Sequence, residues 1–171
     1  MIQQYKNAIE NSNIVSKTDI NGIITFVNDE FCESCGYTRE ELIGSDHNIV
    51  RHPDVPDSTF KNLWDTILNK QTYKNTVKNL TKNGKTVYLN TTVTPILNKN
   101  NEIEEFIAIR YDVTREVELK KELEKQYNEL DFLNSTLEFR VKEQTKQLKK
   151  LNTTLEKRIH DEIQKNEQNQ K

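Results

Sequence analysis

The sequence NDEFCESCGYTREELIG, residues 28–44, places two short helices next to each other in the middle of a series of strands. Its first part, DEFCESCGY, predicts a brief helix that ends at Gly36, because glycine adopts the left-handed conformation of a helix C-terminus without strain. Thr38 followed by Glu41 forms a capping box, which predicts that a second helical turn begins there.

Alternating apolar and polar residues on both sides of this stretch predict five strands. Two of them, residues 13–19 and 23–28, flank the pair Asn21-Gly22, which is a hairpin signal. Three further alternating segments follow at residues 72–80, 86–96 and 103–113. Two strands, several short helices and three strands indicate an α+β fold. We expect a five-stranded antiparallel sheet with the helices on one face, enclosing a pocket.

The sequence DSTFKNLWDTILNK, residues 57–70, predicts the clearest helix of the first 114 residues. Asp57 is its expected N-cap. One face of this helix collects the apolar side chains of Phe60, Leu63, Trp64, Ile67 and Leu68. The preceding segment NIVRHPDVP, residues 48–56, contains two prolines, which cannot donate to a helix or sheet ladder, so we expect irregular backbone there.

The order of these elements, together with residues 28–44, the turn KNG at 82–84 and the sequence DVT at 112–114, resembles a PAS sensor domain over residues 13–114. Within that family, HNIVRHPDVP at 47–56 followed by VKN at 77–79 resembles the FAD-binding PAS domain of bacterial aerotaxis receptors. The resemblance implies bound FAD and a set of cofactor-binding positions. These positions are Asn28, Arg51, His52, Asp54, Phe60, Trp64 and Asn79.

The chemistry of these side chains suits a dinucleotide cofactor. Arg51 and His52 offer a cation and N–H donors to a pyrophosphate. Phe60 and Trp64 offer planar apolar walls to a ring system, and the amide of Asn79 matches the polar edge of such a ring. Together with the resemblance, this chemistry leads us to expect FAD in the pocket, with redox or oxygen state passed on as the signal; a small metabolite stays open as another signal.

Three other interpretations stay open from the residues alone. The aromatic pair also suits a plain core, with Arg51 in a local ion pair with Asp54. Haem is a second cofactor to consider, because His47 or His52 can serve as an axial ligand. The third is a cofactor-free PAS domain used only for dimerisation. Nothing resembling the NCRFLQ sequence, which carries the cysteine-adduct photochemistry of light-sensing PAS domains, occurs in the chain.

The last part of the chain, residues 115–171, contains an internal repeat. LNSTLEFRVKEQ at 133–144 recurs as LNTTLEKRIHDE at 151–162, an offset of eighteen residues or about five helical turns, so both copies present the same face. The apolar stripe of that face consists of Leu130, Leu133, Leu137, Val141, Leu148, Leu151, Leu155, Ile159 and Ile163. Its spacing predicts a nearly straight, dimeric coiled coil, with Thr114 as the N-cap of the long helix. The repeat also resembles the linker of bacterial sensor histidine kinases.

Composition excludes several classes of function. The net charge is −2 and neither half is strongly basic, so we expect no nucleic-acid partner. No apolar run reaches the length of a membrane span, so we expect no membrane contact from this segment. Two cysteines form no disulfide framework, which fits the reducing cytoplasm.

Residues 1–12 predict a short amphipathic helix that contributes to the homodimer.

Two further motifs predict no chemistry. Cys32 and Cys35 form a C-x-x-C pair, but it lies within a helix and has no partner cysteines for zinc, so we expect no metal site. His160 aligns with Lys142 in the repeat, at an exposed position, which argues against a phosphoacceptor. The given sequence contains no stretch that resembles a phosphoacceptor box or an ATP-binding domain. We therefore expect no catalytic residue and a sensor module that feeds an output domain, such as that of a histidine kinase.

Overall fold

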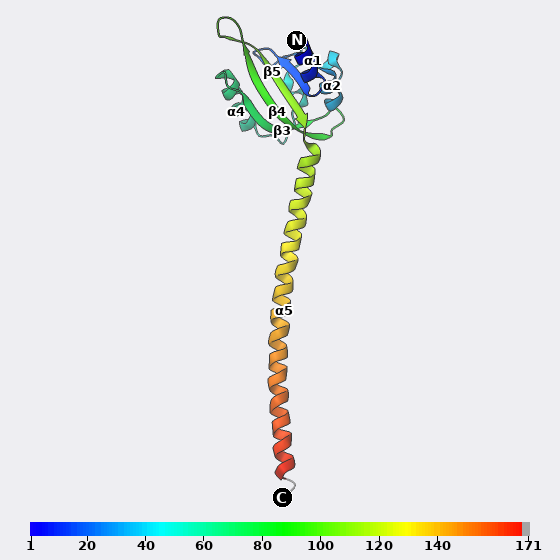
Figure 1. Ribbon diagram of the computed structural model, residues 1–171, viewed down its shortest axis with the longest axis vertical. Coiled ribbons are helices and arrows are strands. Elements are labelled where there is room, and N and C mark those ends of the chain that lie inside the picture. Colours follow the sequence, from blue (N-terminus) through cyan, green and yellow to red (C-terminus); the bar gives the residue numbers. More distant parts are fainter. Residues whose placement is uncertain (169–171) are drawn as a thin grey trace. The chain divides into compact units, whose positions relative to one another are not determined.

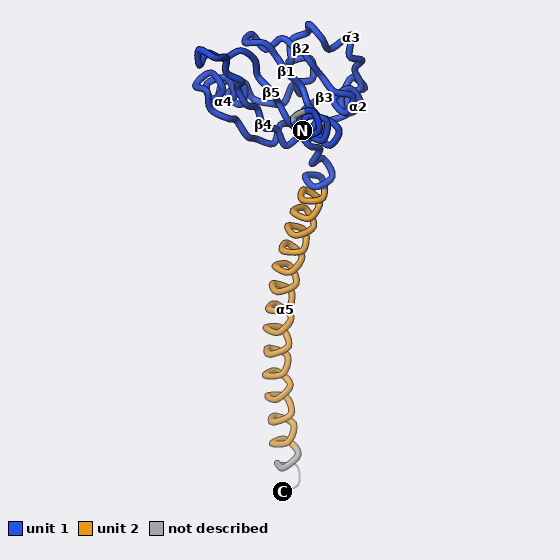
Figure 2. Tube along the Cα trace, turned by 45° about the horizontal axis from the view of Figure 1, so that its top comes forward, with its two compact units in different colours: residues 1–118 blue, residues 119–171 orange. Residues whose placement is uncertain are grey.

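The structure is a computed structural model that describes residues 1–168, with the backbone alone at Ile2 and residues 166–168. The chain divides into two compact units, residues 1–118 and residues 119–171 (Figure 2). The last three residues of the predicted coiled coil, 169–171, lie outside the described residues.

The first unit is built on a sheet of five strands in the order β2-β1-β5-β4-β3 (Figure 1). The strands are β1 (Ile14–Thr18), β2 (Ile24–Val27), β3 (Tyr73–Leu80), β4 (Thr86–Leu97) and β5 (Ile103–Asp112). Every neighbouring pair is antiparallel. The predicted α+β fold is therefore confirmed, with the last strand at the centre of the sheet.

The turn between β1 and β2 is held by one carboxylate. Asp19 Oδ1 accepts hydrogen bonds from the backbone N–H groups of Asn21 and Ile23, both at 2.9 Å. Gly22 has φ +84°, the left-handed region that favours glycine. The hairpin predicted from Asn21-Gly22 is thus present.

Two short helices follow the hairpin, as predicted. Helix α2 (Asp29–Cys35) ends at Gly36, whose φ is +76°. Helix α3 (Arg39–Leu42) starts with the complete capping box: the Glu41 N–H donates to Thr38 Oγ1 at 3.4 Å, and the Thr38 N–H donates to the Glu41 carboxylate at 3.0 Å. These ends fix the two helices over β1 and β2.

Two apolar clusters fill the space between the helices and one face of the sheet. The first combines Phe31 and Leu42 of the short helices with Val87 and Leu89 of β4. The second lies under α4 (Asp57–Leu68) and contains its Ile67. The chain also forms η1 (His47–Val50), a short 3₁₀ helix that overlaps the start of the segment expected to be irregular and adds Val50 to the first cluster.

The start of α4 differs from the sequence-based expectation. Asp57 is the first helical residue and Pro56 the N-cap, without a side-chain cap. Proline is favourable at a helix start because its φ is already near the helical value. The carboxylate of Asp57 is instead paired with Arg51.

Two more helices complete the chain. Helix α1 (Ile2–Glu10) precedes the sheet and leaves Tyr5 and Ile9 exposed. Helix α5 (Thr114–Gln168) is unbroken, and the apolar stripe predicted for it is exposed throughout in the single chain. Among the described helices, none combines the length and apolar composition needed to cross a bilayer.

Thr114 has a different role from the predicted N-cap. It is the first residue of α5, and its N–H donates to Asp112 Oδ1 at 2.7 Å. Its hydroxyl accepts from the backbone N–H of Tyr88 on β4 at 2.9 Å. The threonine therefore ties the helix start to the neighbouring strand.

Candidate ligand-binding pocket

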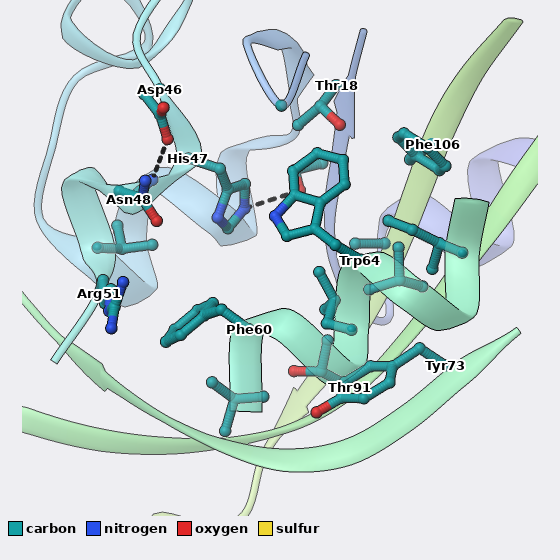
Figure 3. A pocket seen from close by; sticks show the side chains of 18 of the residues that line it. Thr18, Asp46, His47, Asn48, Arg51, Phe60, Trp64, Tyr73, Thr91 and Phe106 are labelled. Atoms are coloured by element: carbon teal, nitrogen blue, oxygen red, sulfur yellow. Dashed lines mark hydrogen bonds between the residues drawn. The ribbon is translucent and has the colours of Figure 1, made fainter. Parts of the chain in front are cut away.

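A cavity of about 370 Å³ lies between α4, η1 and the inner face of the sheet (Figure 3). This volume falls near the lower end of the range typical of small-molecule sites. Its wall combines aliphatic and aromatic side chains with a few polar ones, which is the usual composition of a ligand pocket.

Aromatic rings form a large part of the wall. Phe60 and Trp64 point from α4 into the cavity (Figure 3). The Trp64 ring meets Phe106 of β5 edge to face, with 5.8 Å between ring centroids. A Cβ atom added to Gly22 would lie 3.1 Å from the Trp64 indole, tighter than an ordinary contact, and the φ of +84° favours glycine at this position independently.

Arg51 and Asn79 line the same cavity and bring η1 and β3 together. The two residues form an isolated antiparallel β-bridge. The Arg51 guanidinium lies 4.0 Å from the centre of the Phe60 ring and is paired with Asp57. Arg51 Nη2 also donates to the Val55 carbonyl at 3.3 Å. Of the seven predicted cofactor positions, the structure thus brings four together around the cavity: Arg51, Phe60, Trp64 and Asn79.

The other three predicted positions lie outside the cavity lining. Asn28 is buried at the N-terminus of α2, where its amide bonds four backbone groups. His52 is buried too: its Nδ1 accepts from the Asp54 N–H, and its Nε2 bonds Thr86 Oγ1, both at 3.1 Å. The observed contacts of these residues hold the backbone in place, and cofactor binding by them stays a prediction.

One of the alternative interpretations predicted a local ion pair between Arg51 and Asp54, and this prediction is wrong. Arg51 pairs with Asp57, whereas the Asp54 carboxylate accepts from Lys78 Nζ of β3 at 2.5 Å. The Lys78 ammonium holds the pKa of Asp54 below its usual value. The loop is therefore tied to α4 by one residue and to the sheet by the other.

A buried polar cluster at the cavity was not predicted from the sequence. Arg110 of β5, Ser16 of β1 and His47 of η1 all line it. Arg110 Nη1 donates to Ser16 Oγ and Arg110 Nη2 to His47 Nε2, both at 2.9 Å. Burial, together with the Arg110 charge, lowers the pKa of His47 to about 3. The sequence signal that points to this cluster is an arginine on the same side of β5 as the buried Phe106 and Ala108.

The two cysteines have no connection with the cavity. Cys32 and Cys35 are free thiols in α2 and neither belongs to the cavity lining. Burial raises the pKa of both thiols, which opposes formation of a reactive thiolate. In the part of the chain that the structure describes, no three His, Cys, Asp or Glu side chains are grouped to hold a metal.

We therefore expect the double variant Cys32→Ser, Cys35→Ser to keep whatever ligand the pocket binds. Loss of packing at the buried Cys35 should lower the free energy of unfolding by only about 1–2 kcal/mol. Urea unfolding and the ligand content of the purified variant measure both effects. A variant that folds but binds no ligand would show that the thiols take part in the site.

Comparisons with known proteins identify a family and several relatives that resemble this chain. A family model described as the PAS fold matches residues 24–110. The aerotaxis receptor of Escherichia coli is 34% identical over 67% of this chain and 22% of its own length. A blue-light photoreceptor of Listeria innocua is 33% identical over 68% of this chain and 46% of its own length. The chain thus spans less than half of either relative.

A solved structure agrees with the fold. The PAS domain of a protein from Colwellia psychrerythraea superposes with a TM-score of 0.61 at 21% identity, covering 67% of this chain and 98% of that domain. The five-stranded antiparallel sheet with helices on one face is therefore the PAS architecture that the sequence resemblance implied.

Proposed function

The chain belongs to the PAS-fold family, and from this premise we propose that residues 13–114 are a sensor domain that binds FAD in the cavity. Residues 115–171 form a dimeric coiled coil that passes the redox or oxygen state of the flavin to an output domain. A histidine kinase is the output domain we propose, with the chain itself catalysing no reaction and acting in the cytoplasm.

The observation that carries this proposal is the composition of the cavity wall. A flavin needs flat apolar contacts for its ring and hydrogen-bonding groups for its carbonyl-bearing edge. The rings of Phe60, Trp64 and Phe106 offer the first, while Asn79 and Arg110 offer N–H donors to the second. A volume of about 370 Å³ suits a ring system rather than a whole dinucleotide, so the remainder of FAD lies outside the cavity. When bound, the flavin supplies reversible electron transfer.

The relatives support a chromophore of this kind. A blue-light photoreceptor needs one, because no protein side chain absorbs visible light, and the Listeria innocua protein of that name is similar to this chain over 117 residues. The likeness to an aerotaxis receptor supports the FAD-binding subfamily suggested by residues 47–56. Neither cysteine lines the cavity, which is consistent with redox sensing rather than a cysteine adduct.

Haem receives less support from the geometry. His47 Nε2 accepts from Arg110, so iron ligation through that atom would displace a buried hydrogen bond. His52 lies outside the cavity lining, and both of its ring nitrogens are hydrogen-bonded. Ligation of haem iron by either histidine requires these hydrogen bonds to rearrange, whereas binding of FAD in the cavity does not.

The exposed stripe of α5 supports the dimer. Leu137 and Leu155 occupy equivalent positions of the eighteen-residue repeat and are about half exposed, at 46% and 44%. Burying such a stripe against a second copy of the same helix removes apolar surface from water. His160 is exposed and hydrogen-bonded to Gln164, and we assign it no part in signalling.

Replacing Trp64 by alanine tests the cofactor proposal. The variant should bind FAD about tenfold more weakly, since the lost packing of the ring is worth on the order of 1.5 kcal/mol. Leu68→Ala is the matched control, because Leu68 lies on the same helix, is exposed and does not line the cavity. Fluorescence titration of cofactor-free protein with FAD measures both affinities. Equal FAD affinities for the two variants would contradict this placement of the cofactor.

A further inference from the structure

Arg110 is a buried cation with unused hydrogen-bond donors. Only 4% of the residue is exposed, and it lines the cavity from the central strand β5. An arginine carries five N–H donors, and its bonds to Ser16 and His47 use two of them. Its guanidinium also lies 5.5 Å from the centre of the Phe31 ring. Donors therefore remain for a ligand in the cavity.

Among the residues that the structure describes, no carboxylate pairs with the charge of Arg110. Burial lowers its pKa to about 10, which leaves the guanidinium protonated at neutral pH. A buried charge that faces only neutral partners is unfavourable, and a ligand that brings negative charge relieves that cost. Arg51, at the same cavity, already has Asp57 as its counter-ion.

His47 is a neutral acceptor that orients this cation. Arginine has no acceptor atom, so His47 Nε2 must accept the bond from Arg110, and the ring proton of the neutral imidazole lies on Nδ1. The ring is further fixed edge to face on Phe31, with 5.8 Å between centroids. With its pKa lowered to about 3, His47 adds no second positive charge near neutral pH.

We propose that Arg110, held by Ser16 and His47, is the group that recognises the electron-rich edge of the flavin and binds the reduced, anionic cofactor more tightly than the oxidised one. This inference rests on the proposed function. Flavin reduced by dithionite takes up two electrons and one proton, so one negative charge stays on the ring system. Arg110 is the uncompensated cation that the cavity offers to this charge, which raises the midpoint potential of the bound flavin.

Arg110→Met is the direct test, since methionine retains apolar volume without charge or donors. We expect the variant to lose affinity for reduced FAD about 30- to 100-fold more than for oxidised FAD, as for a hydrogen bond to a charged group. By the thermodynamic cycle, this fold-change lowers the two-electron midpoint potential by about 45–60 mV. Anaerobic titration with reference dyes measures the potential.

Arg51→Gln is the matched control, because it removes the same unit of charge from the same cavity at a more exposed place. The side chains of Arg51 and its partner Asp57 are 28% and 95% exposed, so water and salt screen the change. It should weaken binding of both redox forms alike and leave the potential within about 15 mV. An unchanged potential in Arg110→Met, or equal shifts in the two variants, would overturn the proposal. A merely structural arginine predicts that unfolding changes while the potential does not.

The wild-type protein provides a test that does not depend on a variant that folds. If Arg110 keeps the reduced flavin anionic, the midpoint potential should fall by about 30 mV for each unit that the pH rises, which corresponds to one proton for two electrons. This slope should hold down to a lower pH than it does for free FAD in the same buffer. A slope that steepens to about 60 mV per unit at the same pH as for free FAD, or above it, refutes the inference. Protein that takes up no FAD refutes the proposed function instead.

Discussion

Replacing Asn28 by alanine should lower the free energy of unfolding by about 3 kcal/mol and the melting temperature of residues 1–118 by about 10 °C. The side chain is only 7% exposed. Its Oδ1 accepts from the backbone N–H groups of Val15 at 2.9 Å and Phe31 at 3.1 Å. Its Nδ2 donates to the carbonyls of Glu10 at 2.6 Å and Asn13 at 2.7 Å. Alanine leaves four backbone groups without this partner, one each in α1, β1 and α2 and one at Asn13 in the connection between α1 and β1.

Asn69→Ala is the control, because Asn69 makes one exposed bond to its own helix, and its effect should stay within about 0.5 kcal/mol. Urea unfolding followed by circular dichroism measures both variants. The experiment also decides the role of Asn28, which the sequence resemblance assigned to the cofactor. Unchanged stability together with lost FAD binding would return Asn28 to the ligand site and contradict the structural role.

The double variant Leu137→Glu, Leu155→Glu should be monomeric at concentrations where the wild-type chain is a dimer. Each buried leucine in a helix interface is worth about 1.5–3 kcal/mol, and the two positions occur twice in a homodimer. The summed loss is about 6 kcal/mol or more, before the burial of carboxylates is added. Sedimentation equilibrium measures the change in dissociation constant, which should exceed about four orders of magnitude.

Ser135→Glu, Thr153→Glu is the matched control for that experiment. The two positions are also eighteen residues apart and gain the same charge. They lie two residues before Leu137 and Leu155, which is about 200° around the helix and therefore off the stripe. Both side chains are exposed and bond only the preceding turn. If the leucine variant stays dimeric, the first unit rather than α5 holds the two chains together.

Sequence patterns predicted the elements well where one local interaction defines them. The capping box of Thr38 and Glu41 and the turn at Gly22 are both present, because each depends on residues within five positions of one another. The start of α4 was displaced by one residue, since the sequence does not reveal that Asp57 is drawn to Arg51 of the preceding loop.

The pocket was predicted less completely, for a physical reason. Alternation along β5 places Ile107 and Ile109 on one side and Phe106 and Arg110 on the other, and it is the second side that lines the cavity. Which side of a central strand faces the helices depends on pairing with two neighbours. The role of Arg110 also depends on its hydrogen bonds to Ser16 and His47, and these residues are too distant in sequence for the contacts to be predicted.

The cofactor content of the purified chain tests the central claim most directly. The protein is expressed without added cofactor, separated from small molecules and denatured, and the released chromophore is identified by chromatography and mass. We predict that FAD is released at no more than one molecule per chain. Incubating the isolated protein with excess FAD should not raise this ratio above one. A colourless protein that takes up no FAD, or one that releases haem, would contradict the account.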